Sequence, residues 1–160
     1  MDLSLILRPV GAQDMRLLFD WRNLDLIISL SSSQRAVTWE EHTAWFSGIV
    51  GSERCLLYII LLGETPIGQV RFDLDSDQRA IVSIYLLPGF HGKGFGTTAL
   101  RNACEKLHAD RPDAREILAQ IRANNTRSIL SFNKAGFKPK EDALTADDHV
   151  ALSLPLSVPN

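Results

Sequence analysis

This chain has little cysteine, no excess of positive charge and no long apolar run. Its two cysteines, Cys55 and Cys104, lie within apolar patterns, which indicates core packing and argues against a disulfide framework or a metal site. Its 17 basic and 19 acidic residues give a net charge of −2, so there is no basic field for tracking a nucleic-acid backbone. The longest apolar run, residues 55–62, is too short to cross a bilayer. We therefore expect no metal, nucleic-acid or membrane partner.

Targeting signals are also missing from the beginning of the chain, which lacks a basic start followed by a small-residue cleavage site. We therefore expect a cytoplasmic protein. A length of 160 residues and a hydrophobic content of 45% suit one globular domain with a substantial core. The expected domain spans residues 1–160.

The order of periodic segments predicts an α/β fold on a mixed sheet with flanking helices. A strand and a helix come first, then a serine-rich loop, then a helix opened by the capping box of Thr38 and Glu41. Three strands separated by short turns predict an antiparallel meander, and the later strand-helix-strand order predicts parallel neighbours. The expected strands are residues 3–7, 55–62, 66–73, 79–86, 116–121, 137–140 and 149–154, and the expected helices are 12–23, 38–49, 97–108 and 125–135.

Four glycines fall within eight residues, between the end of an apolar strand and the start of an amphipathic helix. Glycine permits unusual φ angles and lets a ligand approach the main chain closely. The backbone N–H groups of this segment can therefore converge on one anion, at which the following helix aims its positive end. The predicted donors are His91, Gly92, Lys93, Gly94, Phe95, Gly96 and Thr97.

Two common phosphate loops do not match this segment. A Walker A loop requires Ser or Thr after its lysine, but Lys93 is followed by Gly94. A dinucleotide-binding loop requires a glycine beyond Gly96 and an early place in a parallel unit, whereas here three strands of a meander precede the loop.

A third loop does match. His91-Gly92-Lys93-Gly94-Phe95-Gly96 resembles the Arg/Gln-x-x-Gly-x-Gly loop of the GCN5-related N-acetyltransferase (GNAT) superfamily. The later sequence Asn125-Thr126-Arg127-Ser128, followed by Phe132-Asn133-Lys134-Ala135-Gly136-Phe137, is similar to that superfamily's second coenzyme-facing segment. The resemblance implies a GNAT fold, acetyl-CoA as co-substrate, its pyrophosphate on the glycine loop, and Asn125 and Ser128 beside its pantetheine arm.

A narrower resemblance concerns the acceptor. Trp21-Arg22-Asn23, Thr38-x-x-Glu41-His42 and the segment from Pro66 to Asp73 look like the acetyltransferases that modify the 4-amino group of a nucleotide-linked deoxyaminosugar in pseudaminic-acid pathways. The Trp-Arg-Asn opening is shared with ribosomal-protein N-terminal acetyltransferases. The expected reaction is therefore N-acetylation of a small amine, with a protein N-terminal acetyltransferase or a non-catalytic acyl-CoA-binding module as the alternatives. An exposed edge strand makes a homodimer a reasonable expectation.

The resemblance also implies how the reaction proceeds. The strands 79–86 and 116–121 are expected to splay apart, with the pantetheine arm in the gap. Backbone groups at Leu86 and Leu87 would bind the arm, and one N–H would stabilise charge on the thioester oxygen. Two departures leave the acid and base open: Phe132 stands where many relatives have a proton-donating tyrosine, and Asn124 where others have a carboxylate.

Tyr85 and His42 are the candidates for proton transfer. Tyr85 lies near the expected thioester, although a strand tyrosine often only packs. His42 shares a helical face with two aromatic residues, which suits either a base or a packing histidine. Arg22 and Arg71 are candidates to bind an acceptor phosphate or carboxylate, or else to form ordinary ion pairs. The resemblance in the Trp-Arg-Asn segment makes Asn23 a further candidate to bind the acceptor.

Overall fold

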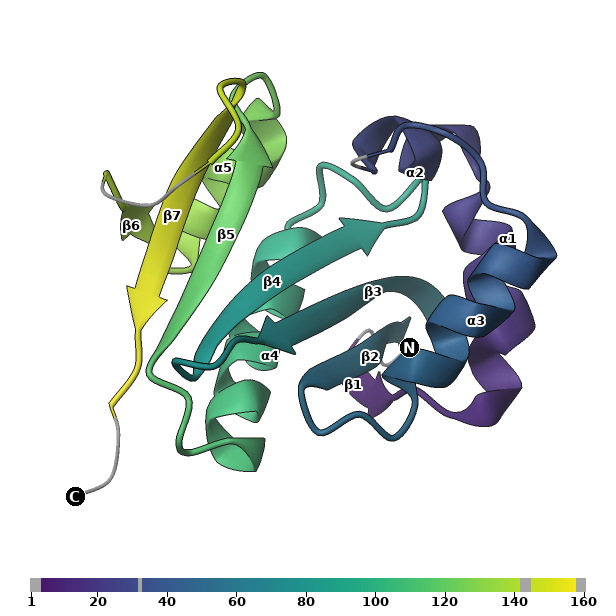
Figure 1. Ribbon diagram of the computed structural model, residues 1–160. Helices are drawn as coiled ribbons and strands as arrows, with labels where there is room; N and C mark the ends of the chain where they lie inside the picture. The colour runs from purple at the N-terminus through teal and green to yellow at the C-terminus, as the bar shows by residue number, and fades with distance from the viewer. Residues whose placement is uncertain (1–3, 32, 142–144, 158–160) are drawn as a thin grey trace.

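The structure, a computed structural model, describes residues 4–31, 33–141 and 145–157. In these ranges the chain forms a sheet of seven strands in the order β1-β2-β3-β4-β5-β7-β6. Helices cover both faces of the sheet, and the sheet opens between β4 and β5 (Figure 1). This arrangement confirms the mixed α/β fold that the sequence predicts.

The first four strands are antiparallel. β1 (Leu5–Pro9) pairs with β2 (Cys55–Leu62), and the meander continues through β3 (Thr65–Leu74) and β4 (Arg79–Leu86). The predicted meander is therefore confirmed, with its boundaries shifted by one residue on β3. β1 ends two residues later than predicted and includes Pro9 itself.

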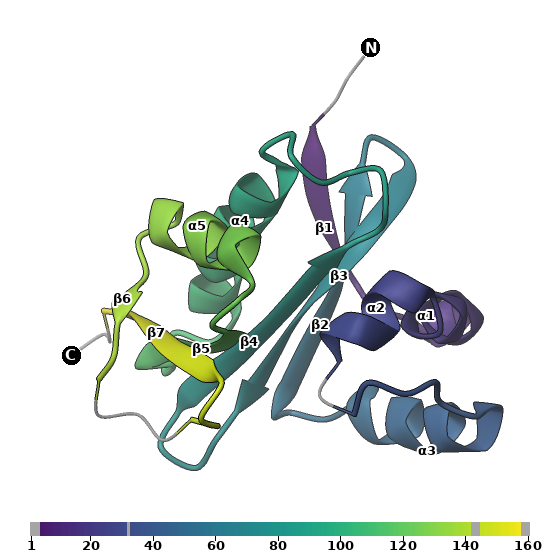
Figure 2. The same cartoon turned by 90° about the horizontal axis from the view of Figure 1, so that it is seen from above.

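The helices of the N-terminal half cover one face of this meander (Figure 2). The predicted first helix is divided into a short 3₁₀ helix, η1 (Ala12–Asp14), and α1 (Met15–Arg22). A further helix, α2 (Asp25–Leu30), lies where the sequence predicts no element. The helix α3 (Trp39–Ile49) begins at the predicted capping box, in which the Glu41 N–H donates to the Thr38 hydroxyl at 3.1 Å.

The C-terminal half begins with α4 (Phe95–Asp110), which leads into β5 (Glu116–Arg122), the parallel neighbour of β4. Then follow α5 (Thr126–Lys134), β6 (Lys138–Pro139) and β7 (His149–Pro155). β7 lies between β5 and β6 and is antiparallel to both. α4 and α5 cover the face of the sheet opposite α1 and α3 (Figure 2).

Each face of the sheet has its own apolar core. On the α4 side, the predicted helical stripe of Leu100, Ala103, Cys104 and Leu107 is buried against the sheet, which confirms Cys104 as a packing residue. On the other side, α1 and α3 bury Leu18, Trp21 and Phe46 against Leu57 and Ile59 of β2. The sheet is thus fixed by helices on both sides while its two halves separate in the middle.

Candidate active site

A cleft opens where β4 and β5 separate. The two strands pair at three positions, Arg79 to Ile81 with Glu116 to Leu118, and then diverge (Figure 1). Leu86 and Phe132 contribute apolar walls, and the mouth carries polar side chains. The cleft is lined by Leu26, Leu30, Ile84, Tyr85, Leu86, His91, Gly96, Leu100, Asn125, Arg127, Ser128, Ser131 and Phe132.

The backbone of Leu86 faces this cleft, whereas that of Leu87 does not. The Leu87 N–H donates to the Ile67 carbonyl on β3 at 2.7 Å, and the Leu87 carbonyl accepts from the Phe90 N–H at 3.2 Å. In an antiparallel ladder this bond makes Leu86 and Gly68 a non-hydrogen-bonded pair, so the polar backbone groups of Leu86 point away from β3 and toward the gap. This corrects the prediction for Leu87, whose backbone groups are already used within the protein.

The glycine loop leaves its main-chain donors free. Gly92 and Gly94 have φ angles of +75° and +83°, which favour glycine, whereas Gly96 lies inside α4 with helical backbone. Within the described residues, no hydrogen bond uses a backbone N–H between His91 and Thr97. Because α4 is 16 residues long and begins here, these donors and the positive end of the helix lie together. Gly96 therefore belongs to the first turn of α4 and not to the positive-φ part of the loop.

The opposite wall of the cleft is the first half of α5. The Asn125 side-chain oxygen accepts from the Ser128 N–H at 3.2 Å and so caps this helix, while both residues line the cleft. One helical turn later, Phe132 is 2% exposed and packs edge-on against Phe137, with 4.9 Å between ring centroids. The cleft wall at this position is therefore a closely packed aromatic ring without a hydroxyl group.

Tyr85 lies on the β4 side of the cleft. Its ring meets Trp21 of α1 edge-on at 6.4 Å, and the structure gives its hydroxyl no hydrogen-bond partner within the described residues. Burial raises the pKa of Tyr85, and the charges of Arg22 and Arg71 oppose that rise without reversing it. The Tyr85 hydroxyl is therefore protonated at neutral pH, and its raised pKa makes it a weaker acid than an exposed tyrosine.

His42 is held in a different environment. It is 3% exposed, its Nε2 lies 2.8 Å from the Met15 carbonyl oxygen, and it contacts the rings of Phe19, Trp45 and Phe46. It is not among the residues that line the cleft. Because a carbonyl can only accept, Nε2 carries the proton in this bond. The surroundings are those of a packing histidine that ties α3 to α1.

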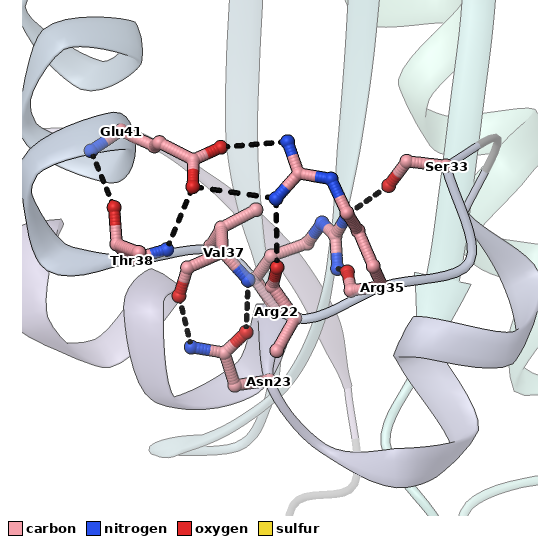
Figure 3. A network of polar contacts seen from close by, with 8 residues as sticks. Arg22, Asn23, Ser33, Arg35, Val37, Thr38 and Glu41 are labelled. Atoms are coloured by element: carbon pink, nitrogen blue, oxygen red, sulfur yellow. Dashed lines mark hydrogen bonds and ion pairs between the residues drawn. The ribbon is translucent and has the colours of Figure 1, made fainter.

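The residues expected to bind the acceptor lie at the end of α1 and on β3. Asn23 exchanges two hydrogen bonds with the Val37 backbone, at 2.8 and 3.0 Å, and Arg22 donates to the Arg35 carbonyl and the Ser33 hydroxyl (Figure 3). These bonds hold the segment before α3 against α1, and they use the Asn23 side-chain oxygen and one of its two amide N–H groups.

Arg71 lies on β3, where its guanidinium is 2.9 Å from an Asp73 carboxylate oxygen and 5.9 Å from the Trp45 ring centroid. The charges of both Arg22 and Arg71 act on the Tyr85 hydroxyl, as its pKa shows. Arg22 and Arg71 therefore lie near enough to Tyr85 for their positive charges to act on its hydroxyl group. The structure places His42 in the aromatic cluster instead.

The sequence analysis assigned no place in the cleft to six of its lining residues, Leu26, Leu30, Ile84, Leu100, Arg127 and Ser131. Leu26 and Leu30 come from the unpredicted helix α2, and Arg127 crosses from α5 to the glycine loop, where its Nη1 lies 2.6 Å from His91 Nδ1. Arg127 stands within the quoted Asn-x-x-Ser segment, so its position beside the cleft was readable from the sequence. Its partner across the cleft was not, because that contact depends on tertiary structure.

Residues 4–138 match the model of a family described as "Acetyltransferase (GNAT) domain". The chain belongs to the GNAT acetyltransferase family. An uncharacterized protein of Methanocaldococcus jannaschii, MJ1062, is 29% identical over 146 residues. That match covers 86% of this chain but only 28% of MJ1062, so this chain corresponds to about a quarter of that protein.

Solved structures share the GNAT fold. A domain from Methanocaldococcus jannaschii is 26% identical with a TM-score of 0.81, and the alignment covers 96% of this chain and 99% of that domain. The aminoglycoside acetyltransferase AAC(6')-Ib, solved with coenzyme A, is 22% identical with a TM-score of 0.82 over 95% of each chain. These likenesses confirm the predicted GNAT fold, while the narrower amino-sugar resemblance finds no counterpart among the relatives named here.

Within the described ranges, no group of three or more His, Cys, Asp or Glu residues is placed to hold a metal ion. In the same ranges, no helix is long and apolar enough to cross a membrane. The cleft between β4 and β5 is the candidate functional site.

Proposed function

We propose that this protein is an acetyl-CoA-dependent N-acetyltransferase whose acceptor amine carries an anionic group, most specifically the 4-amino group of a nucleotide-linked deoxyaminosugar. Membership of the acetyltransferase family supports the reaction class. The observation that supports the acceptor class is the pair of guanidinium groups, Arg22 and Arg71, acting on the Tyr85 hydroxyl.

The residues of the cleft fit the coenzyme. The unused N–H groups of residues 91–97 suit the pyrophosphate, and the gap-facing backbone of Leu86 suits an amide of the pantetheine arm. Asn125 and Ser128 would face that arm from α5. Structures of similar fold, including AAC(6')-Ib and a ribosomal L7/L12 alpha-N-protein acetyltransferase, were solved with coenzyme A.

Acetyl-CoA supplies an acetyl thioester to the site. The amine nitrogen forms a bond to the carbonyl carbon, the carbon–sulfur bond breaks, the nitrogen loses one proton and the sulfur gains one. The N–H of Leu86 is placed to stabilise the negative charge that develops on the carbonyl oxygen. Tyr85, which is protonated at neutral pH, is the proposed donor of a proton to the sulfur; bulk water takes the proton from the amine and returns one to Tyr85.

The charges near Tyr85 favour some acceptors over others. Related folds include enzymes named for aminoglycosides and spermidine, both of which are polycations. Two arginines beside the proton donor repel a polycation and attract phosphate, which a guanidinium binds in a bidentate manner. A nucleotide sugar offers a diphosphate at one end and a neutral amine at the other, which matches this distribution.

The test is an acceptor comparison at saturating acetyl-CoA. We expect turnover with a nucleotide-linked 4-amino-4,6-dideoxy sugar, and a much higher KM for the same sugar without its nucleotide. Arg71→Gln should raise the KM for the nucleotide sugar about tenfold while leaving the KM for acetyl-CoA unchanged. Arg54→Gln is the matched control, because Arg54 bonds the Asp75 carbonyl outside the cleft.

The same assay separates the alternatives. Turnover of a peptide with a free N-terminus, and none of the nucleotide sugar, would favour a protein N-terminal acetyltransferase. Preference for spermidine or an aminoglycoside would contradict the proposed charge match. Tight acetyl-CoA binding with no turnover of any amine would identify a non-catalytic acyl-CoA-binding module.

A further inference from the structure

One imidazole joins the two walls of the cleft. His91 lies in the glycine loop, and its Nε2 is 3.0 Å from the carbonyl oxygen of Leu86 on β4. Its Nδ1 is 2.6 Å from Nη1 of Arg127 on α5. All three residues line the cleft, so this chain of contacts runs from β4 through the loop to α5.

The partners of His91 fix its protonation state. A guanidinium group can only donate, so Nδ1 must accept and carry no proton. A carbonyl can only accept, so Nε2 must carry the proton and donate it to Leu86. His91 is therefore the neutral Nε2–H tautomer in this arrangement, and a proton added to Nδ1 would break the bond to Arg127.

We propose that His91 and Arg127 form a latch on the coenzyme cleft, in which Arg127 is a diphosphate ligand held against His91 until the coenzyme binds. The inference rests on the proposed acetyl-CoA dependence. The exposed Arg127 guanidinium lies beside the loop whose free N–H groups form the anion site. A diphosphate in that site offers Arg127 a doubly charged partner in place of a neutral ring nitrogen. His91 acts as a positioning residue that keeps its bond to Leu86 in both states.

Breaking the latch changes the proton affinity of His91. With Arg127 on Nδ1, protonation is opposed by an adjacent cation. With Arg127 on the diphosphate, Nδ1 is free and faces an anion, so protonation is favoured. Coenzyme binding is therefore linked to proton uptake, and affinity should rise as the pH falls through the range in which histidines titrate.

Other ionisable groups around the cleft do not supply the same link. Tyr85 on β4 has a raised pKa and stays protonated throughout this range. Lys93, in the loop itself, is positively charged and opposes protonation of His91 whether the latch is closed or open. The cleft residues of α2 and α4 are Leu26, Leu30, Gly96 and Leu100, none of which carries an ionisable side chain. His91 is thus the residue of the described cleft lining whose charged surroundings change when the latch opens.

The test is calorimetry of coenzyme A binding at pH 6 and pH 8, in buffers of different ionisation enthalpy, with the full chain. We expect the wild type to bind several-fold tighter at pH 6 and to take up a proton. The 3′-phosphate of coenzyme A also titrates in this range, so the comparison with His91→Gln carries the test. Glutamine donates to Leu86 and accepts from Arg127 but takes no proton.

His91→Gln should therefore show a smaller ratio between its affinities at pH 6 and pH 8 than the wild type, and should take up fewer protons on binding. Arg127→Gln should weaken binding about tenfold at both pH values. His108→Gln is the matched control, because His108 bonds the Ser157 carbonyl away from the cleft. Equal pH dependence in wild type and His91→Gln would overturn the latch. Failure of the wild type to bind coenzyme A at either pH would instead overturn the proposed function on which it rests.

Discussion

At the scale of single residues, Tyr85 is the proposed proton donor, because the hydroxyl that many relatives place on α5 is absent here. Tyr85→Phe keeps the edge-on contact with Trp21 and removes only the hydroxyl. We expect kcat to fall about 10²-fold with little change in the KM for acetyl-CoA, as general acid catalysis predicts. Tyr58→Phe is the control, since that hydroxyl donates to Asp110 at 2.9 Å outside the cleft. An unchanged kcat in Tyr85→Phe would assign the proton transfer to water.

Phe132 allows the complementary experiment on the other wall. The ring already lines the cleft and is 2% exposed, so Phe132→Tyr restores a hydroxyl at the place where relatives carry one. We expect a modest rise in kcat, largest at low pH, because a hydroxyl beside the sulfur can accelerate only the breakdown of the thioester. A sharp loss of kcat in a variant that still binds acetyl-CoA would show that Phe132 shapes the acceptor pocket instead.

At the scale of elements, the conformation of the glycine loop could be predicted, because it depends on residues that are close together in the sequence. Positive φ at Gly92 and Gly94 agrees with the glycine-rich pattern, whereas α4 begins at Phe95, two residues before the predicted Thr97. α2 could not be predicted in this way, since six residues are too few to form a stable helix alone. It is held by burial of Ile27, which is 3% exposed, and by the hydrogen bonds of Arg22 and Asn23 to the following segment (Figure 3).

The loop also provides a matched pair of glycine substitutions. A Cβ atom at Gly94 would have no protein atom within 4 Å and would point to where the diphosphate is expected to approach. Any other residue at this position would be strained by the φ angle of +83°. Gly51, after α3, has the same open surroundings and a φ of +88° but lies outside the glycine loop. We expect both valine variants to lose similar stability and Gly94→Val alone to lose acetyl-CoA binding, measured by calorimetry. Equal affinity in the two variants would remove the loop from the site.

At the scale of the whole molecule, the family resemblance predicted the order of strands and the gap between β4 and β5 more completely than it predicted the site. The fold follows from periodicity that extends over many residues. The surroundings of Leu87 and Asn23 depend on hydrogen bonds to backbone groups that are distant in the sequence, at Ile67 and Val37. Such bonds leave no periodic signal in the sequence, so the catalytic and acceptor residues stay predictions while the fold is established.

Another contact that no sequence pattern predicts joins the N-terminal strand β1 to η1, the short helix that precedes α1. Asp14 is 4% exposed, and its carboxylate accepts from both Nη atoms of Arg8 on β1 at 2.9 Å and from the Gly11 N–H at 2.8 Å. Burial raises the pKa of Asp14, but the bonds from Arg8 and Gly11 outweigh burial and lower it overall. The carboxylate form therefore stabilises the folded protein.

The direction of that pKa shift gives a prediction for acid stability. A lowered folded-state pKa means that the contribution is complete above the unfolded value, about 4, and is lost as the pH falls through the folded value. Asp14→Asn should lower the free energy of unfolding in urea by about 1.5–3 kcal/mol at pH 7, and this deficit should shrink steadily below pH 4. Asp20→Asn, which removes an exposed pair with Arg16, should cost less than about 0.5 kcal/mol at every pH. A deficit in Asp14→Asn that is the same at pH 7 and at pH 3 would show that the carboxylate charge does not hold β1 to the helices.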